Sequence, residues 1–166
     1  MLSTLVRHHA FVSQVLWADV KDQFDLDDGS LKDLYVFGTN AMDWQTLIDL
    51  IRSRGWRYDY TEDNVSVRLP SSVAAIFLNR QHRATRLAFW PADSLRVHAH
   101  FFDVERIELD LDPHDIQGQP ALDQVCQLLR ALGRALTRDA VLTWENSPQA
   151  TIIAYSHLLD QVQTTH

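Results

Sequence analysis

The pattern of apolar and polar positions predicts two principal helices. In the first, Asn40 supplies an N-cap and Gly55 a C-terminal stop, and the apolar side chains between them recur at the i, i+3, i+4, i+7 spacing of a buried helix face. That face consists of Trp44, Leu47, Ile48 and Ile51. The second helix opens at residues 118–120 and is weakened in its interior by Gly133. Its buried stripe is formed by Leu122, Val125, Cys126, Leu129, Leu132 and Leu136.

Short runs of β-branched, aromatic and alternating residues predict strands. They cover residues 34–37, 57–60, 65–69, 86–90, 95–102, 106–112, 140–144 and 151–155. Pro70 breaks the pattern, and periodicity leaves open whether residues 71–78 form a short helix or another strand. Short links favour antiparallel pairing. The sequence therefore predicts an α+β fold, with a mainly antiparallel sheet and the two principal helices packed on one face.

The first segment of the chain differs from the rest because residues 2–18 contain no acid. An amphipathic helix would bring its apolar residues near one side: Leu5, Val12, Val15 and Leu16. We therefore expect an N-terminal helical extension over residues 1–25, followed by a single α+β domain over residues 26–166.

No segment has the character of a signal peptide or a membrane span. The apolar residues near the N-terminus are interrupted too often for a signal-peptide core, and no later stretch approaches the roughly 20 apolar residues of a membrane helix. With a single cysteine, Cys126, the chain cannot form an intramolecular disulfide. We therefore expect a cytoplasmic protein that does not bind membranes.

The composition fits one substantial hydrophobic core, because 46% of the 166 residues are apolar. The net charge of −7 argues against nucleic-acid binding, since a surface that follows phosphates needs basic side chains. Residues 19–33 and 103–115 hold 12 of the 22 acids. If these two stretches lie together in the fold, they form a negative patch that attracts a basic partner. The alternative is a solvated, solubilising surface.

Candidate metal ligands alternate along two neighbouring predicted strands. His98 and His100 share one face of the first strand. In the next strand, Glu108, Asp110 and Asp112 also share a face. Two histidines beside three carboxylates could hold a divalent transition metal, which would suit a small metal-dependent enzyme. The same alternation is typical of any half-exposed antiparallel hairpin, so we favour that interpretation and expect neither a catalytic residue nor a cofactor.

No motif indicates nucleophilic or nucleotide chemistry. The chain lacks Gly-x-Ser-x-Gly, Gly-x-Gly-x-x-Gly and the phosphate-binding Gly-x-x-x-x-Gly-Lys. Cys126 lies on the apolar stripe of a predicted helix, which favours a buried thiol over a nucleophile.

Several segments together resemble a family of small bacterial proteins of undetermined activity. They are residues 28–36 (DGSLKDLYV), 43–44 (DW), 100–113 (HFFDVERIELDLDP) and 142–148 (LTWENSP). The resemblance spans residues 26–156. Similar small acidic α+β proteins serve as immunity proteins that neutralise polymorphic or contact-dependent toxins. The resemblance implies a protein-binding role and supplies no catalytic residues.

We therefore expect a non-enzymatic module that neutralises a toxin domain through an acidic surface. The contact residues predicted for it are Glu108, Asp110, Asp112 and Trp144, the last being an aromatic anchor at a strand end. Two alternatives stay open. One is the metal-dependent enzyme, which would use His98, His100 and nearby carboxylates. The other is a self-associating structural protein, with the N-terminal segment as the contact of a homodimer.

Overall fold

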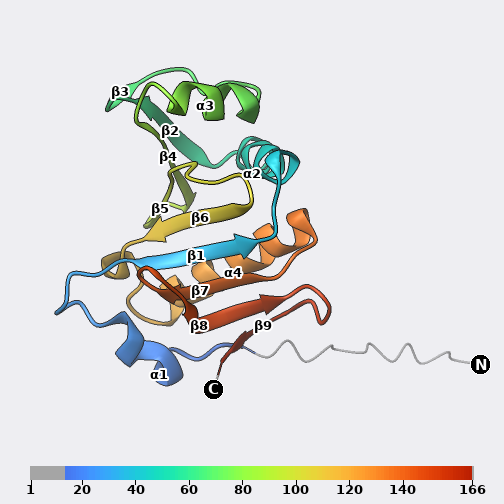
Figure 1. Cartoon of the computed structure of the whole chain (residues 1–166). Helices are drawn as coiled ribbons and strands as arrows, with labels where there is room; N and C mark the ends of the chain where they lie inside the picture. Colours follow the sequence, from blue (N-terminus) through green and yellow to red (C-terminus); the bar gives the residue numbers. More distant parts are fainter. Residues whose placement is uncertain (1–13, 166) are drawn as a thin grey trace, which may run out of the picture.

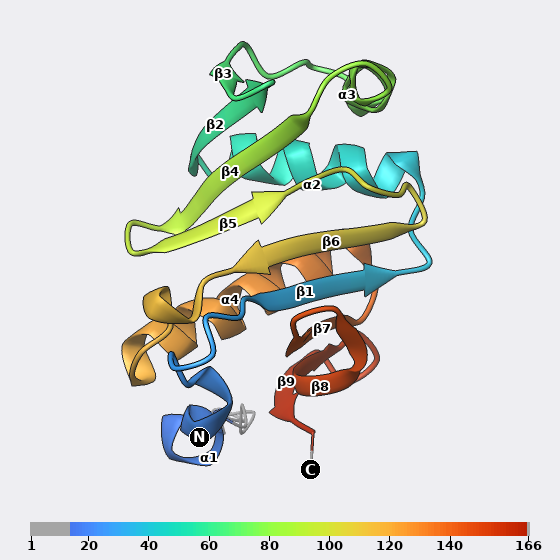
Figure 2. The same ribbon diagram turned by 60° about the vertical axis from the view of Figure 1, so that its left-hand side comes forward.

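A computed structural model describes residues 14–165 and confirms the predicted α+β fold. Its strands form one antiparallel sheet. The helices α2 (Ala41–Ser53) and α4 (Gln119–Leu136) pack on one face of that sheet, as Figures 1 and 2 show. None of the described helices is long and apolar enough to cross a membrane.

The described residues contribute nine strands to the sheet. In chain order they are β1 (Lys32–Phe37), β2 (Arg57–Glu62), β3 (Val65–Ser66), β4 (Thr85–Ala92), β5 (Leu95–Ala99), β6 (Arg106–Leu111), β7 (Ala140–Trp144), β8 (Ser147–Ser156) and β9 (Gln161–Thr164). Their order across the sheet is β3-β2-β4-β5-β6-β1-β7-β8-β9. The first strand in sequence thus lies between β6 and β7, where it joins the two halves of the sheet.

Four shorter helical segments complete the fold: α1 (Trp17–Val20), η1 (Lys21–Phe24), α3 (Val73–Arg80) and η2 (Pro113–Asp115). The structure resolves the ambiguous run 71–78 in favour of a helix. Ser72 is the N-cap of α3, because its hydroxyl accepts a hydrogen bond from the backbone N–H of Ala74 at 3.3 Å.

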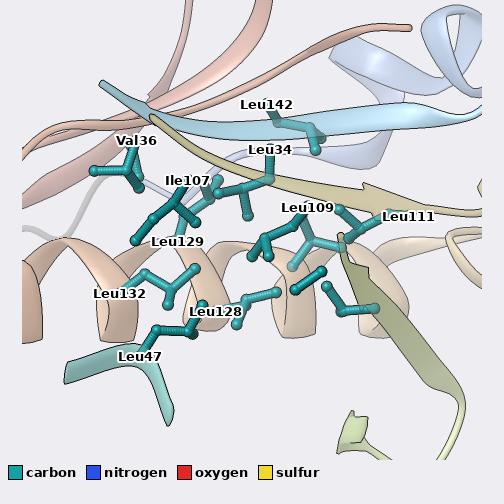
Figure 3. Close-up of a cluster of buried hydrophobic side chains, with 14 of the residues drawn as sticks. Leu34, Val36, Leu47, Ile107, Leu109, Leu111, Leu128, Leu129, Leu132 and Leu142 are labelled. Atoms are coloured by element: carbon teal, nitrogen blue, oxygen red, sulfur yellow. The ribbon is translucent and has the colours of Figure 1, made fainter. Parts of the chain in front are cut away.

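One hydrophobic core lies between the sheet and its two principal helices. Figure 3 shows leucines of α4 facing apolar side chains of β1 and β6: Leu128, Leu129 and Leu132 on the helix, and Leu34, Val36, Ile107, Leu109 and Leu111 on the strands. The stripe predicted for the second helix is buried throughout, and so are the four apolar residues predicted for the first. Burial raises the pKa of Cys126 to about 11, as expected of a thiol within this stripe.

The ends of α2 follow the sequence signals. Asn40 accepts a hydrogen bond from the Asp43 N–H at 3.1 Å, and the Asp43 carboxylate accepts one from the Asn40 N–H at 3.0 Å. This reciprocal capping box satisfies two backbone donors. Gly55 has a φ of +65°, the left-handed conformation that ends a helix without steric cost.

Several predicted strand limits were wrong. The strand predicted over 95–102 ends at Ala99, because Phe101 has a φ of +59° and turns its ring into the core beside Trp44. The strand predicted over 65–69 contains only Val65–Ser66, after which the chain leaves the sheet towards α3. Strand β8 begins at Ser147 instead of residue 151, and β9 was not predicted because its sequence Gln-Val-Gln-Thr carries a single apolar residue.

The N-terminal segment packs onto the domain. The prediction of an amphipathic helix over 2–18 was wrong for residues 14–16, because the first described helix begins at Trp17. Leu5 and Val12 of that prediction lie outside the described residues. Val15, Val20 and Phe24 are buried in the same core as the sheet. The Gln119 side chain holds this segment to the start of α4 by accepting the Trp17 N–H at 2.7 Å and donating to the Val15 carbonyl at 2.9 Å.

Gly133 weakens the α4 helix locally but is required by its packing, because a Cβ there would overlap the Tyr155 ring of β8. We expect Gly133→Ala to lower the free energy of unfolding by roughly 1–3 kcal/mol, although alanine favours a helix by about 1 kcal/mol. Urea denaturation measures the change. In a Tyr155→Ala background the overlapping ring atoms are absent, so the same substitution should cost less than it does in the wild-type chain. A stabilising Gly133→Ala in the wild-type chain would contradict this packing explanation.

Candidate functional site

The face of the sheet opposite α2 and α4 carries the candidate site. Figure 2 shows both helices behind the sheet, and none of the described helices lies in front of its central strands. We call this the open face. Because side chains alternate between the two faces of a strand, the residues between the core positions of β1, β4, β5 and β6 all point towards it.

The strand register brings three carboxylates together at the centre of the open face. Asp110 of β6 pairs with Asp33 of β1, and Glu108 pairs with the next open-face residue of β1, Tyr35. One carboxylate oxygen from each of Asp33, Glu108 and Asp110 lies within 4.8 Å of the others. We call these three residues the carboxylate cluster. It joins the two acidic stretches of the sequence, because Asp33 ends the first stretch and the other two belong to the second.

Asp33 is the most deeply placed member of the cluster, with 2% of its surface exposed. Its Oδ2 accepts hydrogen bonds from the Asn146 backbone N–H at 2.7 Å and from the Tyr35 hydroxyl at 3.0 Å. Burial raises the pKa of the Asp33 carboxyl, and the neighbouring charges of Asp110 and Glu108 raise it further, against the lowering effect of the two hydrogen bonds. Ionised Asp33 is therefore a destabilised group.

The other two carboxylates are mostly buried, with 14% of the Glu108 side chain and 20% of the Asp110 side chain exposed. Glu108 forms an ion pair with Arg106 at 3.2 Å. Asp110 Oδ2 lies 2.6 Å from Nε2 of His100. The cluster thus holds three carboxylates, and Arg106 is the one permanent cation that forms an ion pair with it among the residues described.

The two histidines predicted as metal ligands share the open face, with ring centroids 6.3 Å apart. His100 is the one that hydrogen bonds to the cluster. Burial lowers the pKa of His98, and the positive charges of Arg96 and Arg86 lower it further. His98 therefore favours its neutral form.

The four predicted contact residues do not share one surface. Glu108 and Asp110 belong to the cluster. Asp112 lies just beyond β6, where it caps η2 by accepting the His114 N–H at 2.9 Å. Trp144 is in register with Lys32 and packs against the core, and the Lys32 ammonium lies 3.9 Å from its ring centroid. Trp144 is therefore on the covered face of the sheet, away from the carboxylates.

Exposed apolar side chains gather at one end of the open face and were missed by the sequence analysis. Phe37 ends β1 and is 46% exposed, while Phe102 follows β5 and is 52% exposed. Leu158, after β8, is 91% exposed, and it lines a hollow of about 550 Å³ together with Phe37. We call Phe37, Phe102, Val104 and Leu158 the apolar end. Isolated surface residues have no periodic signal, and Phe37 looked like part of a buried strand run.

Basic side chains occupy the other half of the open face. Arg57, Arg86 and Arg96 lie on β2, β4 and β5, and all three are exposed. Among the residues described, each has no carboxylate oxygen within 4.0 Å. Arg57 stacks on Trp90, with its guanidinium carbon 4.0 Å from the ring centroid. Arginines thus predominate on β2, β4 and β5 of the open face, where Asp59 is also exposed, and carboxylates predominate on β6 and β1, where Arg106 pairs with Glu108.

Comparison of the chain with models of known protein families, with curated proteins and with solved structures finds no match. The resemblance to small bacterial immunity proteins therefore stays a prediction. Function has to be inferred from the geometry of the open face.

Asp33→Asn tests whether the fold holds the three carboxylates together despite their mutual repulsion. The asparagine carbonyl can still accept both hydrogen bonds, and its amide can donate towards the remaining carboxylates. We expect the free energy of unfolding at pH 7 to rise by roughly 1 kcal/mol. Since the Asp33 pKa is raised on folding, wild-type stability falls as pH rises from 3.8 through that pKa, so the difference should vanish below pH 3.8.

The matched control for this prediction is Asp59→Asn, which neutralises an exposed carboxylate of β2 on the same face. Urea denaturation at pH 7 and at pH 3 should show little change for that variant. A wild-type chain that is more stable than Asp33→Asn at pH 7 would contradict the assignment of Asp33 as a destabilised anion.

Proposed function

We propose that this chain is a non-enzymatic protein-binding module, of the immunity type that neutralises a bacterial toxin domain, and that it binds through the open face. One observation carries the proposal: the apolar end adjoins the carboxylate cluster on a sheet face that none of the described helices covers. Large exposed apolar side chains beside charged groups are typical of protein interfaces.

The two parts of this surface have different roles in the proposed complex. Phe37, Phe102 and Leu158 provide affinity, because large apolar side chains that become buried contribute most of the energy of an interface. The hollow beside Phe37 and Leu158 accepts an apolar side chain of the partner. Lysine or arginine of the partner meets Glu108 and Asp110, which sets orientation and association rate.

The carboxylate cluster links stability to binding in this proposal. In the free protein, the repulsion among Asp33, Glu108 and Asp110 costs stability. A cation from a partner offsets that repulsion, so some of the cost is recovered on binding. Surfaces that serve binding commonly retain such unfavourable groups at the expense of stability.

Neutralisation of a toxin by this chain is tested by co-expressing it with the product of each flanking gene. We expect one product to arrest growth and the wild-type chain to relieve that arrest. A Phe37→Asp/Phe102→Asp variant should not relieve it, because it places two charges where the complex would bury phenylalanine rings. Growth rate and co-purification are the measurements. Each of the two substitutions should weaken binding to the toxin domain by roughly 2 kcal/mol or more.

The matched control is Met42→Asp, which places the same charge on an exposed apolar residue of α2 on the covered side. It should neutralise as well as the wild type. Absence of any flanking product whose effect this chain relieves, or equal activity of the Phe37→Asp/Phe102→Asp variant, would contradict the proposal.

A second candidate function is favoured by the convergence of three carboxylate oxygens within 4.8 Å, with His100 on Asp110. Carboxylate and imidazole ligands suit a divalent cation such as Mn²⁺, and bound metal would support the small metal-dependent enzyme. Calorimetric titration of the full chain with Mn²⁺ should then show a stoichiometric site that Asp33→Asn weakens at least about tenfold. A flat titration, or equal binding by Asp33→Asn, would exclude this candidate.

A further inference from the structure

We infer that the open face also binds the open face of a second copy of this chain, about a two-fold axis that runs parallel to the strands between β5 and β6. Two sheets commonly pack face to face with their strands nearly aligned. Such an axis places β5 of one copy opposite β6 of the other and β4 opposite β1. Each residue keeps its level along the strand direction, so the strand register predicts which side chains meet.

The charges of the open face are complementary under this operation. His98 pairs with Asp110 within one copy, so in the dimer each His98, which favours its neutral form, faces Asp110 of the other copy and can donate a ring N–H to that carboxylate. Val97 pairs with Leu111, which places Arg96 and Asp112 at the next level; both line a hollow of about 420 Å³. Arg96 of each copy therefore meets Asp112 of the other. Every such contact occurs twice, as an isologous interface requires.

The next strands outward are complementary as well. At the level of the cluster, Ala88 of β4 faces Asp33 of the second copy, and its small side chain leaves room for the carboxylate. One level further along, Arg86 faces Tyr35 and the neighbouring Glu108 of the second copy. Arg86 and Arg96, which have no carboxylate oxygen within 4.0 Å among the residues described, thus each acquire a carboxylate partner between chains.

The apolar ends of the two copies also come together. An axis parallel to the strands does not reverse their ends, so Phe37 and Phe102 of one copy lie at the same end as those of the other. Apolar side chains that are exposed in the single chain become buried at one end of the dimer. One operation therefore accounts for both the divided charge and the exposed apolar residues.

This dimer shares its surface with the proposed function but does not depend on the partner proposed there. A toxin domain and a second copy would compete for the open face, so self-association would lower the apparent affinity for the toxin. Failure of the dimer leaves toxin binding testable by co-expression, and failure of toxin binding leaves the dimer testable by mass.

The test combines solution mass with two opposite charge reversals in the full-length chain. Sedimentation equilibrium of the wild type should give twice the 19.1 kDa of one chain. Arg96→Asp and Asp112→Arg each place two like-charged pairs in the homodimer, so each should weaken self-association at least about tenfold. An equimolar mixture of the two variants should form a heterodimer, because both pairs are then opposite in charge.

Restoration by mixing also shows that each variant is folded, which a simple loss would not. The control is Arg54→Asp, an exposed residue at the end of α2 on the covered side, which should dimerise as the wild type does. A wild-type monomer at all concentrations overturns the inference and leaves the open face to a different protein. A dimer that is unaffected by either reversal, or reversals that mixing does not rescue, overturns the assigned face.

Discussion

The register between β1 and β6 is the constraint on which the rest of the structure depends. On one face of this pair, Leu34 and Leu109 are in register and pack against α4. On the other face, the same register places Asp33 beside Asp110. Because side chains alternate with a period of two, a slip of one residue would expose the apolar set and bury every carboxylate. The core therefore enforces the carboxylate cluster, and helix packing on one side determines the chemistry of the other.

The cluster gives the open face its physical character. Three carboxylates lie together, and among the residues that the structure describes Arg106 is the one arginine ion-paired with them. Asp33 is almost fully buried. The hydrogen bonds from Tyr35 and Asn146 hold the Asp33 carboxylate in place but do not neutralise it. The cluster is incompletely neutralised and lies beside exposed phenylalanines. A partner that covers this surface would offset the repulsion among the carboxylates and bury the apolar rings. The toxin binding and the pairing with a second copy that we propose are two ways of covering it, and in each a basic side chain of the other molecule would approach the carboxylates.

Local sequence signals were sufficient for the elements that depend on local physics. The spacing of Trp44 to Ile51 and the caps at Asn40 and Gly55 predicted α2 correctly, and the alternation in β6 predicted which of its side chains point outward. Pairing between distant segments carries no such signal. Insertion of β1 between β6 and β7 brings Asp33 to Glu108 and Asp110, and no local pattern indicated that contact. The sheet face on which Trp144 lies was not predictable for the same reason, because it depends on the register of Trp144 with Lys32.

The ionisation of Asp33 tests most directly whether the fold holds the carboxylate cluster together despite the repulsion among its charges. A titration of the side-chain carboxyl carbons by NMR, in the wild-type chain and in Asp110→Asn, reports that ionisation residue by residue. The pKa of Asp33 should lie above 3.8 in the wild type, because of burial and of the neighbouring charges, and should fall when Asp110 is neutralised. A pKa of Asp33 at or below 3.8 that does not respond to Asp110→Asn would contradict the presence of such repulsion.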